Sequence, residues 1–277
     1  SQPRHAASQR FALRDRANPP GARVVGKMVR RGFAVIMIRN IGTPSLAYQS
    51  PAGGMPSQSQ LLSGFAETLS QYLCEVQPGG GNESPEPALE TEAVLFVLDG
   101  SLDITLDNTV HRLKPIGYAY IPPGSGWAAR SDTEAAVRSL WIHNAYERVE
   151  GIDPAEAFYT NERDISPLAI SDTDGKWIIT PFVDLKNICH DMQVNIVTFE
   201  PGAFIPFMEI RVMKHGLHVL EGKAVYRLNQ DWVEIEAGDY IWLRAFCPQA
   251  CYAGGLGKFR YLLYKNITRH MPLTAVQ

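Results

Sequence analysis

The segment FMEIRVMKHG, residues 207 to 216, gathers side chains that could do chemistry. Glu209, Arg211, Met213 and His215 alternate along it, so on one continuous strand all four would point to the same side. A carboxylate and an imidazole on one face suit manganese, iron or zinc. An ordinary ion pair between Glu209 and Arg211, with His215 packed in a core, would give the same pattern. The segment is therefore a metal cradle, a cradle that has lost a ligand, or a surface strand.

Three further residues could bind a substrate near this segment. Tyr261 and Lys265 lie four positions apart in the last apolar stretch, so on a strand they share a face. A lysine that points into a barrel has to meet an anion or a carbonyl group, since burying its charge alone is unfavourable. Tyr226 follows a Glu-Gly turn on an expected strand. Tyrosines on strands are more often core residues than site residues, so Tyr226 and Tyr261 depend on their companions for a functional interpretation.

The elements that must position these residues belong to an internal repeat with an offset of about 122 residues. Four pairs of segments recur in the same order: QPGGG and EPGAF near 77 and 200, VLDG and VLEG at 97–100 and 219–222, LKPIGYAYI and IEAGDYI at 113–121 and 235–241, and RSLWIHN and RYLLYKN at 138–144 and 260–266. Four matches at a nearly constant offset predict two copies of one domain.

Each copy is a series of short apolar stretches separated by turn residues. Strands are expected at Val94–Leu98, Leu102–Leu106, Gly117–Ile121 and Val137–Ile142 in the first copy, and at Val194–Phe199, Leu217–Leu220, Ala224–Leu228, Tyr240–Leu243 and Phe259–Tyr264 in the second. This spacing favours an all-β sandwich or barrel. The stretch SGFAETLSQYL, Ser63 to Leu73, fits a short helix or a strand, and both alternatives stay open.

The repeat divides the chain into four parts. Residues 1–50 are expected to form an N-terminal arm with leading strands, 51–149 the first domain, and 181–277 the second. Residues 150–180 between them are polar and interrupted by proline and glycine, which is typical of a connector. The basic N-terminus lacks the apolar segment of a secretory signal, so a solvated arm is expected there.

Composition argues against several classes of function. Lys and Arg total 26 against 29 for Asp and Glu, so no basic excess indicates a nucleic-acid partner. No run of about 18 apolar residues is present, so no membrane span is expected. The four cysteines, Cys74, Cys189, Cys247 and Cys251, are too few for a disulfide scaffold and lack zinc-finger spacing. Free core thiols in a reducing cytoplasm are expected.

The order of turns resembles the cupin pattern, in which a Pro-Gly turn, an acid-Gly turn and a Gly-Asp turn separate the strands. The resemblance implies a bicupin, that is, two tandem jelly-roll (double-stranded β-helix) barrels that can hold a ligand or metal. Cupin ligands come from the strand before the acid-Gly turn and from a later strand, which here implies Glu209, His215 and Gln249. The first copy has Ala93 and the WAA of 127–129 at matching places. We therefore expect a degenerate first barrel without metal that serves packing and assembly.

The second copy contains the segments DMQVNIVTFEPGAF, EIRVMKHG, VLEGKAVYRL, DWVEIEAGDYIWL, PQACYAGG and YLLYKN. These segments resemble the (S)-ureidoglycine aminohydrolases, bicupins of purine (allantoin) degradation that are also known as glyoxylate-induced proteins. The resemblance covers roughly residues 60 to 270 and is clearest after residue 190. The family motif is Glu-x-His-x-x-x-His followed by a later Gln, and it binds manganese in the second barrel.

The resemblance implies a role for each matching position. Glu209, His215 and Gln249 are implied to be manganese ligands. Glu209 and Lys265 are implied to be catalytic. The residues implied or expected to contact the substrate are Arg211, Tyr226, Tyr261 and Lys265.

Arg211 departs from the family motif because it stands in the place of the first ligand histidine. A guanidinium stays protonated and has no lone pair to give to a metal. Three ligands would remain, with a like charge beside them, and metal binding would weaken. Alternatively, Arg211 pairs with Glu209, replaces the metal and binds a substrate carboxylate in bidentate fashion. In a third arrangement Arg211 swings out and water fills the position.

The predicted function is that of a metal-dependent hydrolase that releases ammonia from ureidoglycine and leaves ureidoglycolate. The expected partner is a small ureido or amino carboxylate, with neither nucleic acid nor membrane involved. The alternative is a metal-free bicupin that binds a small carboxylate, either as a sensor or as a divergent enzyme. The unclustered histidines argue against a cupin isomerase or oxygenase. A homo-oligomer is expected because jelly-roll edges often pair between subunits.

Overall fold

The computed structural model describes residues 69–82 and 89–266, together with four short strands nearer the N-terminus, β1 (Met28–Arg30), β2 (Val35–Ile38), β3 (Ala47–Tyr48) and β4 (Ser57–Leu61). Apart from a 3-10 turn at Glu162–Asp164, the described residues form strands, turns and loops. None of these residues belongs to a helix long and apolar enough to cross a membrane. The expected all-β class is therefore confirmed.

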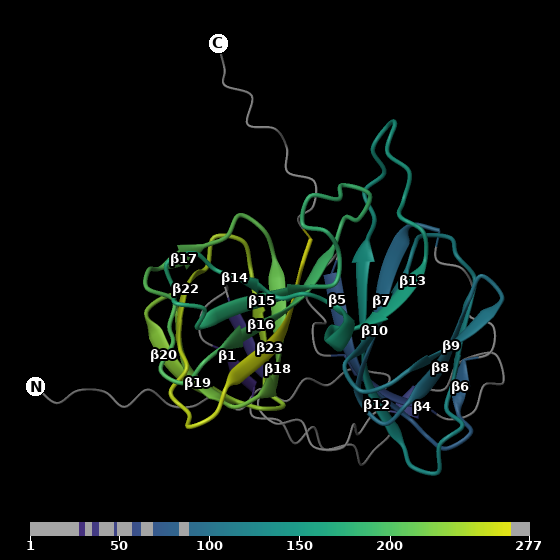
Figure 1. The fold of residues 1–277 in the computed structure, drawn as a ribbon, viewed down its shortest axis with the longest axis horizontal. Coiled ribbons are helices and arrows are strands. Elements are labelled where there is room, and N and C mark those ends of the chain that lie inside the picture. The colour runs from purple at the N-terminus through teal and green to yellow at the C-terminus, as the bar shows by residue number, and fades with distance from the viewer. Residues whose placement is uncertain are drawn as a thin grey trace, which may run out of the picture.

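The first barrel consists of two antiparallel sheets that face each other (Figure 1). The larger sheet contains, in spatial order, β13 (Phe158–Asn161), β10 (Gly117–Ile121), β7 (Thr91–Asp99), β12 (Val137–Ala145), β5 (Leu69–Val76), β4 and β3. The smaller sheet contains β6 (Gly81–Asn82), β11 (Trp127–Arg130), β8 (Leu102–Leu106) and β9 (Thr109–Leu113).

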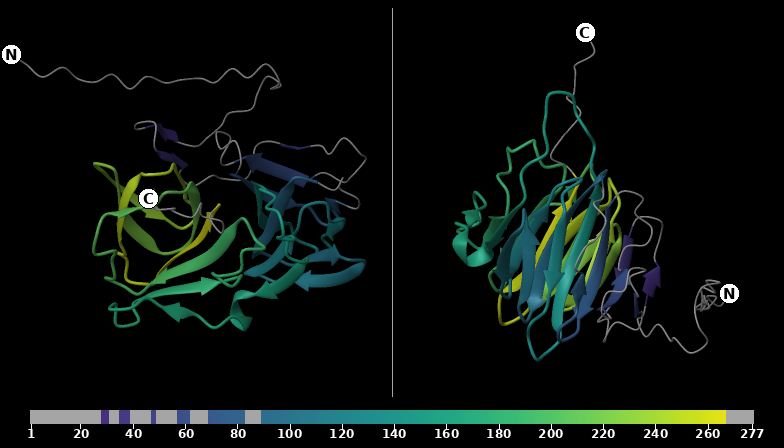
Figure 2. Two further views of the ribbon diagram at one scale, coloured as in Figure 1. Left: turned by 90° about the horizontal axis from the view of Figure 1, so that it is seen from above. Right: turned by 90° about the vertical axis from the view of Figure 1, so that its right-hand side faces the viewer.

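The second barrel repeats this arrangement beside the first (Figure 2). Its larger sheet contains β1, β2, β21 (Tyr240–Leu243), β18 (His215–Glu221), β23 (Phe259–Lys265), β16 (Gln193–Phe199), β15 (Trp177–Pro181) and β14 (Leu168–Ala169). Its smaller sheet contains β17 (Glu209–Ile210), β22 (Pro248–Tyr252), β19 (Lys223–Leu228) and β20 (Asp231–Glu236). The two tandem jelly-roll barrels predicted from the sequence are thus present.

Strand register confirms the internal repeat. In the first barrel Ala93 faces Ile121 on one side and His143 on the other. In the second barrel the residue at the same place, His215, faces Leu243 and Lys265. Each of these three positions in the first barrel is 122 residues before its counterpart in the second, so the repeated segments form equivalent strands.

The core has three parts, one inside each barrel and one between the barrels. The central strands of both larger sheets read as continuous apolar runs because both of their faces are buried. On β7, Leu95 points into the first barrel while Phe96 points at the second. On β23, Leu263 points into the second barrel while Tyr264 points at the first. Because the two larger sheets pack face to face, one side of each barrel is buried.

All nine predicted strands lie within strands of the structure. Several of the other strands, among them β9, β11, β20 and β22, were not predicted. The strands of the smaller sheets are hard to predict because polar residues on their outer face interrupt the apolar pattern, as in DWVEIE of β20. In the stretch 63–73 the strand alternative is correct for Leu69–Leu73, and residues 63–68 lie outside the described part.

One sequence-based prediction about the polar segment is wrong. Residues 207–216 do not form a single strand, because the ladder stops after Ile210 and a new strand starts at His215. The chain crosses here from the smaller to the larger sheet of the second barrel, so alternation cannot be counted through it. The backbone N–H of Phe246 donates to the Arg211 carbonyl at 2.7 Å and supports the crossing.

The predicted connector, residues 150–180, includes β13 of the first barrel's larger sheet and β14 and β15 of the second barrel's larger sheet. Near the N-terminus, β2 pairs with β21 of the second barrel, with Val35 opposite Leu243. The domain boundaries at residues 50, 149 and 180 stay a prediction.

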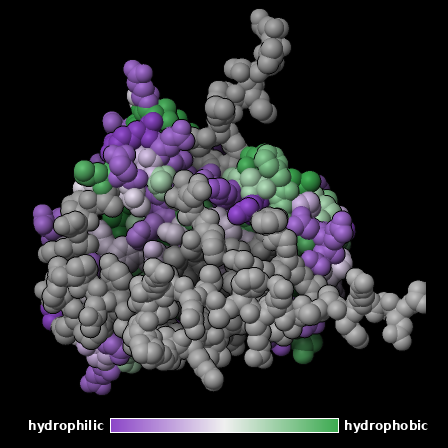
Figure 3. All heavy atoms as spheres, turned by 180° about the vertical axis from the view of Figure 1, so that it is seen from behind, coloured by the Kyte–Doolittle hydropathy of each residue, from purple (hydrophilic) through white to green (hydrophobic). Residues whose placement is uncertain are grey.

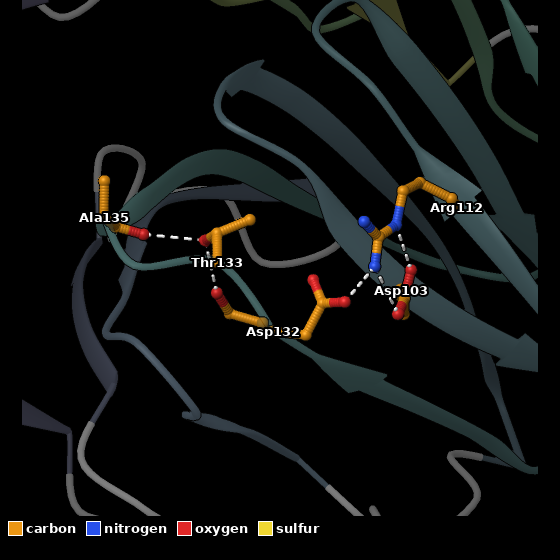
Figure 4. A network of polar contacts seen from close by, with 6 residues as sticks. Asp103, Arg112, Asp132, Thr133 and Ala135 are labelled. Carbon is orange, nitrogen blue, oxygen red and sulfur yellow. Dashed lines mark hydrogen bonds and ion pairs between the residues drawn. The ribbon is translucent and has the colours of Figure 1, made fainter.

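A polar network joins the smaller sheet of the first barrel to its neighbouring loop (Figure 4). Arg112 on β9 donates from Nε to Asp103 on β8 at 2.7 Å and also pairs with Asp132 after β11. Thr133 then donates to the Ala135 carbonyl at 2.8 Å. Because these groups are solvated, we assign the network to local order rather than to function.

Candidate active site in the second barrel

Four of the residues predicted to form the site converge inside the second barrel. Glu209 on β17 and Gln249 on β22 are direct cross-strand partners in the smaller sheet. His215 and Lys265 are direct partners in the larger sheet, at the start of β18 and the end of β23. The barrel thus brings together side chains from both of its sheets, although these residues are up to 56 positions apart in the sequence.

Arg211 lies in the sheet-to-sheet crossing and forms an ion pair with Glu209. Its terminal nitrogen is 2.6 Å from Glu209 Oε1, and the two side chains are only 18% and 19% exposed. Gln249 Nε2 donates to the other carboxylate oxygen, Oε2, at 3.2 Å. Both oxygens of Glu209 therefore already have a partner within the protein.

His215 is a buried neutral imidazole in this cluster. Its side chain is 1% exposed, its Nε2 is 3.0 Å from Gln249 Nε2, and its Nδ1 is 3.3 Å from the Met213 carbonyl. These contacts fit a ring that accepts at Nε2 and donates from Nδ1. Burial, reinforced by the positive charge of Arg211, lowers the pKa of His215 to about 4. At neutral pH the ring consequently carries no charge.

Lys265 is the second cation of the site. Burial, followed by the charge of Arg211, lowers its pKa to about 8, while Glu209 acts in the opposite direction. Within the described residues its ammonium has no ion pair or hydrogen bond. The protein therefore leaves this positive charge partly desolvated and free to meet a ligand.

Tyr226 and Tyr261 are buried in the core of the same barrel. They are 1% and 4% exposed, and they share a hydrogen bond. Tyr226 also hydrogen-bonds Cys251, and burial raises the pKa of all three groups. The charge of Glu209 also raises the pKa of both tyrosines, with a smaller effect than burial. Both belong to the barrel's core, and their contact with a substrate stays a prediction.

Two features of the site were not predicted from the sequence. One is the Met213 carbonyl, whose contact with His215 depends on a backbone bend that no side-chain pattern signals. The other is an apolar rim, Phe207, Ile210, Val212 and Phe246, whose side chains are 57% to 67% exposed beside Glu209 and Arg211. Seen from behind, hydrophobic residues gather on the side of the molecule that holds the second barrel (Figure 3).

The equivalent positions in the first barrel have a different chemistry. Ala93, Trp127 and His143 occupy the places of His215, Gln249 and Lys265. Trp127 packs edge-on against Trp141 with ring centroids 4.4 Å apart, and burial lowers the pKa of His143 to about 4. Aromatic packing therefore takes the space that polar groups take in the second barrel.

The donor set in the second barrel does not fit the manganese implied by the family resemblance. Glu209 is neutralised by Arg211, and Gln249 turns its N–H group, not its oxygen, toward the cluster. Arg211 and Lys265 would place two positive charges beside a divalent cation. The described residues contain no group of three or more His, Cys, Asp or Glu that could hold a metal ion.

Two jelly-roll barrels in tandem define a bicupin. In this one the second barrel gathers a carboxylate, an imidazole and two cations. An (S)-ureidoglycine aminohydrolase of Arabidopsis thaliana is 31% identical over 225 residues, which cover 76% of this chain and 72% of that protein. The enzyme of the same name from Escherichia coli is 29% identical over 204 residues, covering 73% and 77%. The chain belongs to the (S)-ureidoglycine aminohydrolase family.

The solved structures agree with this assignment. A glyoxylate-induced protein of Pseudomonas aeruginosa is 50% identical, with a TM-score of 0.82 over 92% of this chain and 96% of that one. The Escherichia coli protein Ylba, at 23% identity and a TM-score of 0.76, shares the fold.

A rice relative is 30% identical over 202 residues, and the chain spans 63% of its length. No family model matches the chain.

Proposed function

We propose that this chain is a hydrolase that removes the α-amine of ureidoglycine as ammonia and yields ureidoglycolate. The proposal is supported by the family, together with one observation: a carboxylate and two cations meet inside the barrel of the matching half. Ureidoglycine carries a carboxylate, an amine and a ureido group on one carbon atom. A site with one proton acceptor and two positive charges is complementary to such a molecule.

The reaction has two stages whose atoms balance. In the first stage the C–N bond to the amine breaks, the electron pair leaves with the nitrogen as ammonia, and the ureido nitrogen loses a proton to give an imine. In the second stage water adds across the imine: its oxygen bonds to the imine carbon, one of its O–H bonds breaks, and that proton goes to the ureido nitrogen. The barrel therefore has to hold an anion, carry the ureido proton to the leaving amine, and then carry a proton from water to the ureido nitrogen.

The residues present can take these tasks without a metal. Arg211 and Lys265 hold the substrate carboxylate, so that its amine faces Glu209. Glu209 accepts the ureido proton and delivers it to the leaving amine, and Lys265 assists as a second acid because its pKa, about 8, is close to neutral pH. His215 and Gln249 keep the Glu209 carboxylate oriented through the hydrogen bonds described above.

We also propose that the reaction takes place in the cytoplasm as a step of purine catabolism. All four cysteines are free, and three of them are buried, which suits a reducing compartment. Manganese is not assigned to this chain because its donors do not fit the ion. A homo-oligomer remains an expectation from the sequence.

The test is ammonia release from (S)-ureidoglycine, measured against the rate without protein. Glu209→Gln removes the proton acceptor while keeping the shape of the side chain, so kcat should fall by roughly 10²- to 10⁴-fold. Lys258→Met is the matched control, because it removes a cation from an exposed ion pair with Glu200, and it should leave kcat unchanged. Wild-type protein that releases ammonia no faster than buffer would refute the proposed function.

A further inference from the structure

We propose that Arg211 takes over the place of the metal and, with Lys265, forms a metal-free clamp for the carboxylate of the ligand. The inference takes its substrate class from the proposed function. It adds that binding of the ligand carboxylate depends on two protein cations and on no metal ion.

The position of Arg211 favours a ligand with a hydrogen-bond acceptor. Its guanidinium lies inside the barrel and uses one terminal nitrogen for Glu209 at 2.6 Å. Its Nε is buried and has no hydrogen-bond partner. A guanidinium carries five N–H groups in a planar fork, and a buried N–H without an acceptor is unfavourable. The unused donor therefore indicates that a ligand acceptor belongs beside Arg211.

The charges of the cluster do not balance within the protein. Glu209 supplies one negative charge, whereas Arg211 and Lys265 supply two positive charges. Within the described residues no carboxylate forms an ion pair with the Lys265 ammonium, although the charge of Glu209 acts on it. A monoanionic ligand would neutralise the surplus charge, while a neutral ligand would leave a desolvated ammonium unpaired.

Arg211 favours an anion over a metal ion at this place. An arginine cannot be a ligand because it has no lone pair to donate. It also occupies Glu209, the anionic donor that a divalent cation would need. A carboxylate, in contrast, matches the guanidinium fork and accepts a further bond from an ammonium. The same residues that repel a metal ion thus attract a carboxylate.

The experiment uses hydantoate, a ureido carboxylate that lacks the α-amine and therefore cannot react. Isothermal titration into the full-length protein in EDTA should show binding, and Arg211→Gln and Lys265→Met should each weaken it by roughly 10- to 100-fold. Lys258→Met is the matched control and should bind like wild type. N-methylurea, which lacks the carboxylate, should not bind.

A second variant guards against loss of folding. Glu209→Gln frees Arg211 from its internal partner, so hydantoate should bind at least as tightly as in wild type. If Glu209 were instead a metal ligand, the same change would abolish binding. Melting curves of each variant show whether it is folded before its affinity is compared.

Metal analysis completes the test. Protein purified without chelator should contain no stoichiometric manganese, and added manganese should not change hydantoate affinity. One manganese ion per chain, or hydantoate binding that requires manganese, would overturn the inference while leaving the proposed hydrolase intact. Conversely, metal-free hydantoate binding without ammonia release would refute the proposed function and leave the clamp standing.

Discussion

At the scale of single residues, the chemistry of the second barrel depends on Arg211. Gln249 joins the other two expected ligands, since its Nε2 is 3.2 Å from Glu209 Oε2 and 3.0 Å from His215 Nε2, and the role of the three as ligands stays a prediction. The Arg211 guanidinium changes the chemistry of these three residues, because it forms an ion pair with the Glu209 carboxylate and adds a positive charge. We therefore propose that, with Arg211 in this place, the cluster binds an anion and no metal ion.

Gly216, directly after His215, has no room for a side chain. A Cβ atom there would lie 2.4 Å from Cζ and Oη of Tyr264, whose hydroxyl is 2.8 Å from that of Tyr240 in the seam between the barrels. We therefore expect Gly216→Ala to lower the free energy of unfolding by about 1–3 kcal/mol through overpacking. Urea denaturation measures the effect.

The control is Gly126→Ala, since a Cβ at that position meets no atom within 4 Å. It should change the free energy of unfolding by less than about 0.5 kcal/mol. Equal losses in the two variants would contradict the close contact with Tyr264.

At the scale of elements, the break between β17 and β18 positions the site. It lets Glu209 belong to the smaller sheet while His215 belongs to the larger one, so both face the same interior. The sequence identifies these residues because their types are unusual on a strand. It does not reveal the break, because the crossing is held by a backbone hydrogen bond from Phe246 to Arg211 rather than by side chains.

Phe246 tests this element because it combines that hydrogen bond with a left-handed backbone, at φ +63°. Phe246→Gly keeps the N–H group and relieves the backbone, so it should raise the free energy of unfolding by about 0.5–1 kcal/mol. Phe246→Pro removes the donor and cannot adopt this φ, so it should cost about 3 kcal/mol or more and abolish hydantoate binding. A proline variant that binds like wild type would disprove the role of the crossing.

At the scale of the whole molecule, the repeat and the predicted strands define two barrels from sequence alone. The way the barrels pack was not predicted, since an apolar run does not say which face meets which partner. Buried polar groups also lie in the seam. Glu92 of the first barrel accepts from Tyr120 at 2.9 Å and Asn144 at 3.0 Å, and from the backbone of Asp191 in the second. Such a network depends on the assembled tertiary structure.

Burial raises the pKa of Glu92 to about 7. The folded protein then binds this proton more tightly than the unfolded chain, so the contribution of Glu92 to stability is greatest at acidic pH and is lost as pH rises from about 4.5 to about 7. The upper bound of this loss is about 3 kcal/mol. Glu92→Gln removes the titration, so the difference in unfolding free energy between the two proteins should shift across this range. A constant difference would contradict the pKa shift.

The most direct test of the central claim is calorimetric titration of hydantoate into protein stripped of metal by EDTA. If Arg211 has replaced the metal, hydantoate binds with the same affinity before and after chelation, and Arg211→Gln weakens this binding by roughly 10- to 100-fold. Binding that disappears on chelation, returns with manganese and is indifferent to Arg211→Gln would contradict the account.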